Sequence, residues 1–366
     1  MTVICTLPPP RTGQTAVSDA VLRHLRSLTT VRLYDWSGGG GTTGPRWRIR
    51  KAIRSIISAI YVLTLRWRRG EHLYTVANDG FGLWYNTAVA AAARVRGVPV
   101  VYHHHSFAYL HRHDSRLQRL IRWSPGAIHL VLGPEMQTAM KTQYPNVENV
   151  RIATNHFMVD RVASTELPGP NPRTFDNDNP LVIGHLSNLS VEKGIGRVLD
   201  TFTKLHDKGL PVQLRIAGPA TSDSVAAMIH ESVAKYDGDL TWHGPLYGDD
   251  KDQFFQSIDV FLFPTLYATE AQPLVLIEAM QRSVPVLSYR RACIGTLVGD
   301  AGGQLFDPVD DFPAVAAEWI ARVIDDPKFY KDQSERTRLW AEQFGGMADQ
   351  SLATVAGAVG MDRRLI

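Results

Sequence analysis

The stretch Asp259-Val-Phe-Leu-Phe-Pro264, followed by Glu270-Ala-Gln-Pro-Leu-Val-Leu-Ile-Glu278, decides the fold of this chain. The first segment is a short apolar run that ends in proline, which predicts a buried β-strand. The second predicts a helix, because Pro273 suits the first helical position, where its missing N–H has no partner to lose. Strand, loop and helix in this order are the repeating unit of a parallel α/β sheet.

Two carboxylates, Glu270 and Glu278, flank the start of the expected helix with seven residues between them. The backbone amides of Leu274 and Val275 should lie free at that start, where the helix end carries partial positive charge and suits a phosphate group. Glu270 and Glu278 can accept hydrogen bonds from hydroxyl groups on either side of such an anion. Taken alone, the spacing also fits an ordinary surface helix.

The same alternation of strands and helices extends along the chain and indicates doubly wound α/β domains. In the first half, strands are expected at 3–7, 31–35, 73–77, 98–102 and 128–132, with helices at 17–28 and 83–96. In the second half, strands are expected at 181–183, 212–217, 240–243, 260–263 and 284–288. A Pro- and Asn-rich stretch between these halves reads as a linker. The expected division is 1–165, a linker at 166–180, 181–344, and a C-terminal segment at 345–366 that packs back on the first domain.

Composition narrows the class of protein. The chain has 366 residues, 44% of them hydrophobic, and a formal net charge of +3, which suits a globular protein with full cores. Its two cysteines are far apart in sequence and predict a reducing compartment rather than a disulfide framework. The N-terminus lacks the basic and apolar regions of a secretory signal, so a cytoplasmic location is expected.

A local excess of positive charge occurs between Asp35 and Glu71, where there is no acidic residue. The basic residues there are Arg46, Arg48, Arg50, Lys51, Arg54, Arg66, Arg68 and Arg69. They flank an apolar core at 56–65 that is shorter than the ~20 residues of a membrane-spanning helix. Two interpretations remain: a buried helix with solvated arginines at its ends, or peripheral docking of region 46–69 on an anionic membrane surface. Nucleic acid binding is not expected, because no recognised module accompanies the charge.

Three further segments of the second half end expected strands. Ile183-Gly-His-Leu-Ser-Asn-Leu-Ser-Val-Glu-Lys-Gly194 places Lys193 where it can neutralise a diphosphate, at the edge of the sheet where such folds bind ligands. The other two are Ile216-Ala-Gly-Pro219 and Trp242-His-Gly-Pro-Leu-Tyr247.

Together with the Glu270 and Glu278 segment, this ordered set resembles the family 4 retaining glycosyltransferases, among the glycosyl transferases of group 1. The resemblance covers roughly 181–344 well, whereas the first domain matches mainly in layout. It implies the GT-B fold, with two facing Rossmann-like domains and the active site in the interdomain cleft. It also implies a metal-independent, retaining transfer of a sugar from a nucleotide-diphosphate sugar to an acceptor hydroxyl. The donor base (UDP, GDP or ADP), the sugar, the acceptor and the oligomeric state stay open.

By that resemblance, Glu278 holds the donor ribose, Glu270 the transferred sugar and Lys193 the diphosphate, while the backbone near Leu246 holds the nucleobase. Gly218, Gln272, Pro273 and Leu274 complete the expected donor site of the second domain. Asn188 departs from the pattern, because the family usually has an arginine there. The amide of Asn188 can donate a hydrogen bond but carries no charge, so Lys193, the helix end and an arginine elsewhere must stabilise the leaving group.

The first domain contributes two expected features. Gly13, in the loop Pro8-Pro-Pro-Arg-Thr-Gly-Gln14, permits close approach of the backbone to a ligand. The segment Tyr102-His-His-His-Ser-Phe107 lies where the family often has a histidine that lines the reaction centre. Strand alignment favours His104 as this catalytic residue, with His105 as the alternative. Consecutive residues of a strand point to opposite faces, so these histidines do not predict a metal site.

Two other classes of function remain alongside the transferase. A hydrolase or epimerase on the same fold would use the Glu pair as acid and base and form product without an acceptor. A catalytically degenerate protein that binds sugar nucleotides or docks on membranes would bind donor and release nothing, and Asn188 is the residue that points to it.

Overall fold

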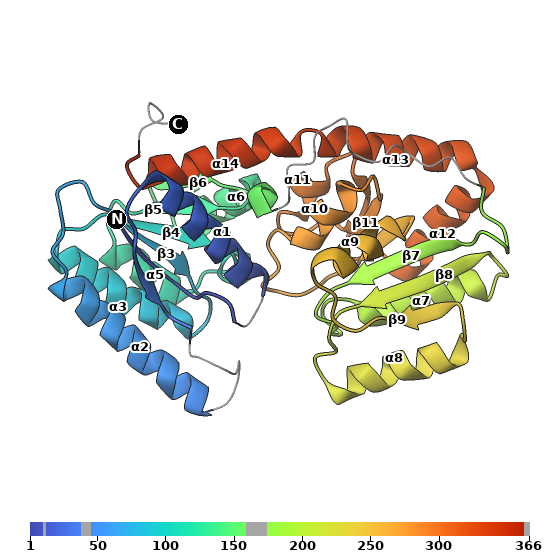
Figure 1. Cartoon of the computed structure of the whole chain (residues 1–366), viewed down its shortest axis with the longest axis horizontal. Coiled ribbons are helices and arrows are strands. Elements are labelled where there is room, and N and C mark those ends of the chain that lie inside the picture. Colours follow the sequence, from blue (N-terminus) through green and yellow to red (C-terminus); the bar gives the residue numbers. More distant parts are fainter. Residues whose placement is uncertain (10–11, 38–44, 159–173, 362–366) are drawn as a thin grey trace. The chain divides into compact units, whose positions relative to one another are not determined.

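The computed structural model describes residues 1–9, 12–37, 45–158 and 174–361 (Figure 1). The chain divides into two compact units, one formed by 1–160 with 346–366 and the other by 161–345. Residues 10–11 of the expected Gly13 loop and 166–173 of the expected linker lie outside the described residues.

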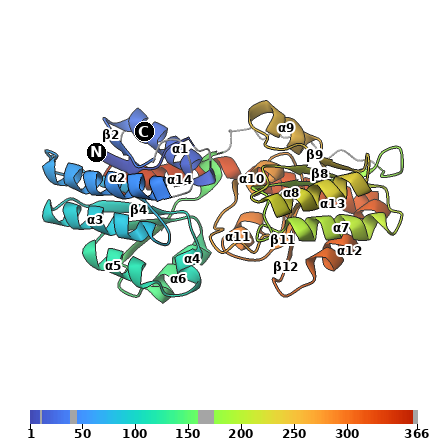
Figure 2. The ribbon, with the colours of Figure 1, turned by 90° about the horizontal axis from the view of Figure 1, so that it is seen from below.

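The first unit contains a six-stranded parallel sheet in the order β2-β1-β3-β4-β5-β6. Its strands are β1 (Thr2–Cys5), β2 (Arg32–Asp35), β3 (Leu73–Ala77), β4 (Val100–His104), β5 (Ile128–Val131) and β6 (Asn149–Ile152). Its helices are α1 (Gly13–Leu28), α2 (Pro45–Thr64), α3 (Gly82–Val95), α4 (Ala108–His111), α5 (Ser115–Trp123), α6 (Pro134–Gln143) and α14 (Phe344–Ala358), with a 3₁₀ turn η1 (Asn155–Met158). Helices α2 and α3 pack side by side (Figures 1 and 2).

The second unit repeats this design with the strand order β12-β11-β10-β7-β8-β9. Its strands are β7 (Leu181–Leu186), β8 (Val212–Ala217), β9 (Leu240–Trp242), β10 (Val260–Phe263), β11 (Val286–Tyr289) and β12 (Gly303–Phe306). Its helices are α7 (Ile195–His206), α8 (Asp223–Lys235), α9 (Gly248–Gln256), α10 (Leu274–Met280), α11 (Ile294–Val298), α12 (Phe312–Asp325) and α13 (Pro327–Ala341).

Strand β10 has the residue pattern of a central strand in a parallel sheet. All four residues of Val-Phe-Leu-Phe are buried, so both faces of the strand are covered. A continuous apolar strand of this kind is typical of parallel sheets with helices on both faces. The prediction of doubly wound α/β units is confirmed.

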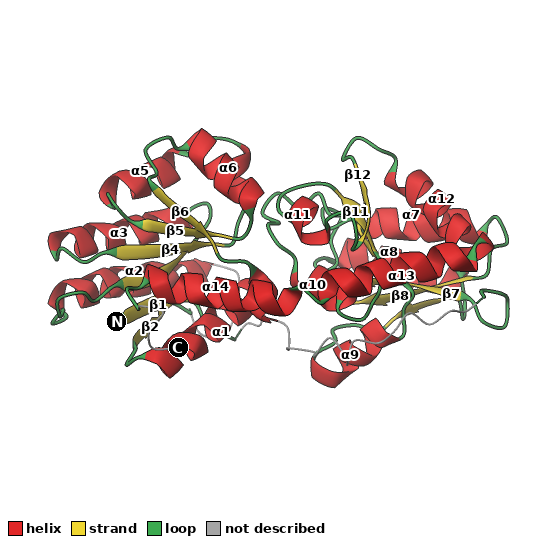
Figure 3. Ribbon diagram, turned by 90° about the horizontal axis from the view of Figure 1, so that it is seen from above, coloured by secondary structure: helices red, strands yellow, loops and turns green. Residues whose placement is uncertain are grey.

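The C-terminal helix α14 belongs to the first unit, although it follows α13 of the second unit in sequence (Figure 3). The hydroxyl of Ser351 accepts a hydrogen bond from the Thr154 amide at 2.9 Å and lies 2.9 Å from the Thr154 hydroxyl. Residues 346–366 therefore complete the unit that the first 160 residues begin.

Candidate donor site

In the second sheet, the direction in which the chain adds strands reverses between β7 and β10. These strands are neighbours, and from them the chain winds outward through β8 and β9 on one side and through β11 and β12 on the other. In an open parallel sheet, the loops that leave the two strands at such a switch point diverge and make a ligand site at the carboxyl edge. The loop after β7 carries Lys193, and the loop after β10 carries Glu270.

Lys193 and Glu270 form an ion pair across this switch point. Lys193 Nζ lies 2.8 Å from Glu270 Oε2, and the two side chains are 20% and 11% exposed. The ammonium also lies 5.2 Å from the ring centroid of Tyr267. The two residues that sequence comparison placed at the reacting end of the donor are thus in direct contact, with part of each side chain open to solvent.

The backbone fixes the distance between these two loops. The amide of Leu266 donates to the carbonyl oxygen of Glu192 at 2.7 Å. Gly194, with a φ of +91°, lies so close that an added Cβ would be 2.4 Å from the carbonyl oxygen of Pro264. A left-handed φ and this close approach both require glycine, so Gly194 lets the Lys193 loop lie directly against the loop after β10.

Glu278 has one paired and one unpaired carboxylate oxygen. Its Oε1 lies 2.6 Å from Nζ of Lys251 on α9. Its Oε2 is buried and has no hydrogen-bond partner. A buried carboxylate oxygen without a partner is costly, and the hydroxyl groups of a bound ribose would satisfy it. Lys251 could not be singled out from the sequence, since it lies on a different helix and outside every recognised motif.

The start of α10 differs by one residue from the prediction. Pro273 is not the first helical residue but the N-cap, with an extended ψ of 126°, and Leu274 begins the helix. The amide of Leu276 donates to the Pro273 carbonyl at 3.4 Å, so Leu274 and Val275 precede the first bonded amide. Gln272, just before this helix start, is buried.

Gly218 and Leu246 occupy the loops after β8 and β9. Gly218 has a φ of +115°, and a Cβ there would lie 1.8 Å from the carbonyl oxygen of Ser187. Its amide donates to Gly244 at 2.6 Å, which ties the loop after β8 to the loop that holds Leu246. Leu246 is partly exposed in that loop.

Asn188 is exposed in the loop after β7. A second cation near Glu270, which the sequence did not single out, is Arg291. Arg291 follows β11, and its Nη1 donates to the carbonyl oxygen of Thr265 at 3.3 Å. The next loop residues stay close, because the Cys293 amide donates to the Ala271 carbonyl at 3.0 Å. Burial lowers the pKa of Arg291, and the nearby charge of Glu270 opposes that shift.

In the first unit, Gly13 is not a loop residue as predicted but the first residue of α1. The reason is local, because Thr12 caps the helix: its hydroxyl accepts from the Thr15 amide at 3.2 Å, and its own amide donates to the Thr15 hydroxyl at 2.9 Å. A Cβ on Gly13 would meet nothing within 4 Å, so the protein itself imposes no need for glycine there.

The histidines after β4 have different surroundings. His104 is fully buried, and both ring nitrogens are engaged, Nδ1 with the Tyr109 hydroxyl and Nε2 with His129 Nδ1, each at 2.9 Å. His105 is partly exposed as a residue, and its Nε2 is buried without a hydrogen-bond partner. His104 therefore has both ring nitrogens engaged within the protein, whereas His105 has one that is unpaired.

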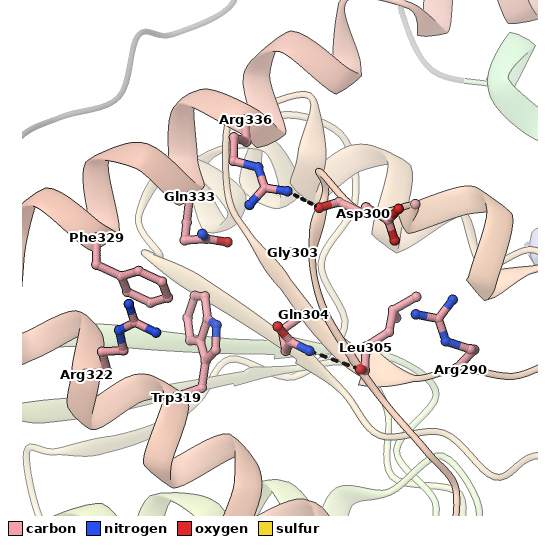
Figure 4. Close-up of a pocket in the computed structure, with 11 residues that line it drawn as sticks. Arg290, Asp300, Gly303, Gln304, Leu305, Trp319, Arg322, Phe329, Gln333 and Arg336 are labelled. Atoms are coloured by element: carbon pink, nitrogen blue, oxygen red, sulfur yellow. Dashed lines mark hydrogen bonds between the residues drawn. The ribbon is translucent and has the colours of Figure 1, made fainter.

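A pocket of about 320 Å³ lies elsewhere in the second unit, between β12 and helices α12 and α13 (Figure 4). Three arginines line it, but Arg336 donates to the Asp300 carbonyl at 2.5 Å and Arg322 stacks on Phe329 at 3.9 Å. The third, Arg290, is the sequence neighbour of Arg291. None of the donor-site residues named above lines this pocket.

Within 1–9, 12–37, 45–158 and 174–361, no group of three or more His, Cys, Asp or Glu residues is arranged to hold a metal ion. Over the same residues, no helix has the length and apolar character needed to cross a bilayer.

A known family matches most of the second unit. Residues 172–340, which contain the Lys193 loop, Glu270 and Glu278, match the family model described as glycosyl transferases group 1. This part of the chain is thus similar to a group 1 glycosyltransferase domain. The capsular polysaccharide biosynthesis glycosyltransferase CapM of Staphylococcus aureus is 30% identical over 155 residues, which cover 41% of this chain and 38% of CapM. The similarity thus spans less than two thirds of that relative.

Solved structures extend the likeness to the whole fold. HepE of Anabaena, in complex with UDP-glucose, superposes with a TM-score of 0.68 at 16% identity and covers 97% of this chain and 99% of its own. Sucrose-phosphate synthase of Thermosynechococcus elongatus has a TM-score of 0.68 at 14% identity, covering 95% and 96%. The two units therefore have the GT-B fold, as predicted.

Proposed function

We propose that the protein is a glycosyltransferase that moves a sugar from a nucleoside diphosphate sugar to an acceptor hydroxyl. The observation that carries this proposal is the Lys193–Glu270 pair at the switch point, with the unpaired Glu278 Oε2 on the next helix. In this proposal Glu270 binds the sugar, Lys193 the diphosphate and Glu278 the ribose, which is the order of these groups along a nucleotide sugar. The group 1 family match and the UDP-glucose held by HepE support the same ligand class.

In this proposal the reaction retains the configuration of the sugar. The bond between the anomeric carbon and the diphosphate oxygen breaks, the acceptor oxygen bonds to that carbon on the same face, and the acceptor proton passes to the departing diphosphate. Lys193 and Arg291 stabilise the charge that develops on the diphosphate, and Glu270 orients the sugar hydroxyls. Arg291 takes the electrostatic role for which Asn188 lacks a charge.

The proposal includes a reaction that needs no divalent cation. Two protein cations beside Glu270 supply positive charge where other sugar-nucleotide enzymes use a metal. Turnover in the presence of EDTA should equal turnover in the presence of added Mg²⁺ or Mn²⁺. Loss of activity in EDTA, with recovery on adding either metal, contradicts this part of the proposal.

The test of the donor site is a thermal-shift titration with UDP, GDP, ADP and their common sugars, because a ligand that binds the folded state raises its stability. One nucleotide should raise the melting temperature, and Glu278→Gln should abolish the shift while the unliganded protein melts as before. Glu318→Gln, at an exposed glutamate of α12, is the matched control that should keep it. No shift with any nucleotide overturns the donor assignment.

The assay for transfer separates the competing classes of function. Release of nucleoside diphosphate that requires an added acceptor supports a transferase. Release of free sugar at an undiminished rate without acceptor identifies a hydrolase, and binding without release identifies a degenerate protein. Lys193→Ala should slow transfer by roughly 100-fold while the protein stays folded, and full turnover in that variant rejects the role of Lys193.

A further inference from the structure

Helix α2 turns an apolar face to solvent. Six large aliphatic residues on it are exposed: Ile49 by 59%, Ile53 by 51%, Ile56 by 60%, Ile57 by 46%, Ile60 by 52% and Leu63 by 40%. Steps of three and four residues recur among them, which places them on one side of a helix with 3.6 residues per turn. These six residues are called the α2 apolar face.

The opposite side of α2 packs against the first unit, and its side chains are small and partly polar. Ser55, Ser58 and Val62 are at most 2% exposed. Ser58 accepts a hydrogen bond from Nε1 of buried Trp36 at 2.9 Å, which fixes the rotation of the helix. A surface helix usually buries its apolar stripe and exposes its polar side, so the pattern of α2 is inverted.

Positive charge surrounds the α2 apolar face. Arg50 is exposed on the helix, and Arg66, Arg68 and Arg69 are exposed just after it. No acidic residue occurs between Asp35 and Glu71 to offset them. An apolar face with a rim of arginines is complementary to a surface that is apolar beneath and anionic above.

We propose that α2 is an interfacial helix that docks on the surface of an anionic phospholipid bilayer. The α2 apolar face enters the boundary between headgroups and acyl chains, and the arginines bind lipid phosphates. A second copy of the chain fits less well, because pairing two α2 helices brings two arginine rims together with no carboxylate from this stretch between them. The inference does not depend on the donor chemistry.

The experiment measures flotation of the full chain with phosphatidylcholine vesicles, with and without phosphatidylglycerol. The protein should float with the vesicles that contain phosphatidylglycerol. Ile56→Glu/Ile60→Glu should lower the partition coefficient by about tenfold or more, because it puts charge into the α2 apolar face, which enters the lipid. Val309→Glu, at a 92% exposed valine in the second unit, is the matched control and should bind as the unaltered protein does.

A second set of variants tests the charges. Arg66→Gln/Arg68→Gln/Arg69→Gln should weaken binding by roughly fivefold per arginine, and salt should weaken binding of the unaltered protein. Ile56→Ser/Ile60→Ser repeats the test of the apolar face without new charge, which keeps the result decisive if the glutamate variant does not fold. Equal flotation of the serine variant and the unaltered protein overturns the proposal. So does an unaltered protein that stays off all vesicles and forms a dimer that the serine variant disrupts.

Discussion

At the scale of single residues, the proposed donor site is a set of charges that are already partly paired. Lys193 forms an ion pair with Glu270, and Lys251 forms one with a single carboxylate oxygen of Glu278. Arg291 differs, because its hydrogen bond is to a backbone carbonyl, at Thr265. An arginine bound to a neutral carbonyl keeps its full charge for an anionic ligand.

Replacing Arg291 should therefore reduce transfer more than folding. Arg291→Ala should lower kcat/KM by on the order of 100-fold, since it removes a charge that stabilises the leaving diphosphate. Arg290→Ala is a control at the adjacent position, where the arginine is exposed and lines a different pocket. Steady-state kinetics with the nucleotide sugar found by thermal shift make the comparison. Equal losses in the two variants would remove Arg291 from the site.

The sequence was enough to single out Lys193, Glu270 and Glu278, but not the basic residues that lie beside the two carboxylates. Lys193, Glu270 and Glu278 lie in local motifs, so their order along the chain was enough to single them out. Lys251 and Arg291 reach the same carboxylates from α9 and from the loop after β11, and such approaches depend on tertiary packing. The choice between His104 and His105 likewise needed the burial and hydrogen bonds of each ring.

At the scale of elements, the loops at the carboxyl edge of the second sheet are set by contacts between backbones. Gly194 lies against Pro264, and Gly218 lies against Ser187, in both cases at a positive φ. Gly238 also has a positive φ, of +86°, but a Cβ there would meet nothing within 4 Å. A comparison of Gly218 with Gly238 therefore separates the free-energy cost of a left-handed backbone from that of a steric clash.

Gly218→Ala should destabilise the protein far more than Gly238→Ala. Gly238→Ala should lower the free energy of unfolding by about 1 kcal/mol, because it imposes only the left-handed backbone conformation on alanine. At 218, the alanine must also push the loop after β7 away, for a total of about 3 kcal/mol or more. Chemical denaturation of both variants gives the difference in the free energy of unfolding. Similar losses at the two sites would mean that the Ser187 loop yields freely.

The central strands were predictable from sequence, whereas two of the four edge strands, β6 and β12, and several strand ends were not. Strands β3, β8 and β10 match their predicted bounds, because each is a distinct apolar run. Strands β6 and β12 lie at sheet edges and carry exposed residues, so their sequences lack that signal. Helix α1 begins earlier than predicted, because Thr12 and Thr15 cap it without a recognised acidic motif.

At the scale of the whole molecule, buried neutral histidines make both units sensitive to acid. Burial lowers the pKa of His103 and His129 in the first unit, and of His185 in the second, from 6.5 to about 4. The folded state therefore binds fewer protons than the unfolded state between these values. Stability is full above pH 6.5 and is lost as the pH falls toward 4.

The free energy of unfolding should thus fall with a slope of up to about 1.4 kcal/mol per pH unit for each such histidine. His129→Gln should flatten the slope by about that amount, whereas His113→Gln, at an exposed histidine, should not change it. Urea denaturation at several pH values between neutral and about pH 5 measures it. A slope that is the same in all three proteins would show that His129 does not contribute.

The return of α14 to the first unit has a consequence for the order of assembly during synthesis. A ribosome makes the chain from its N-terminus, and domains generally fold as they emerge. The second unit is complete once residue 345 has emerged, but the first unit still lacks the helix in which Ser351 bonds Thr154. The unit that begins the chain is therefore the later of the two to be finished, and its sheet, complete by β6, lacks one covering helix until α14 docks.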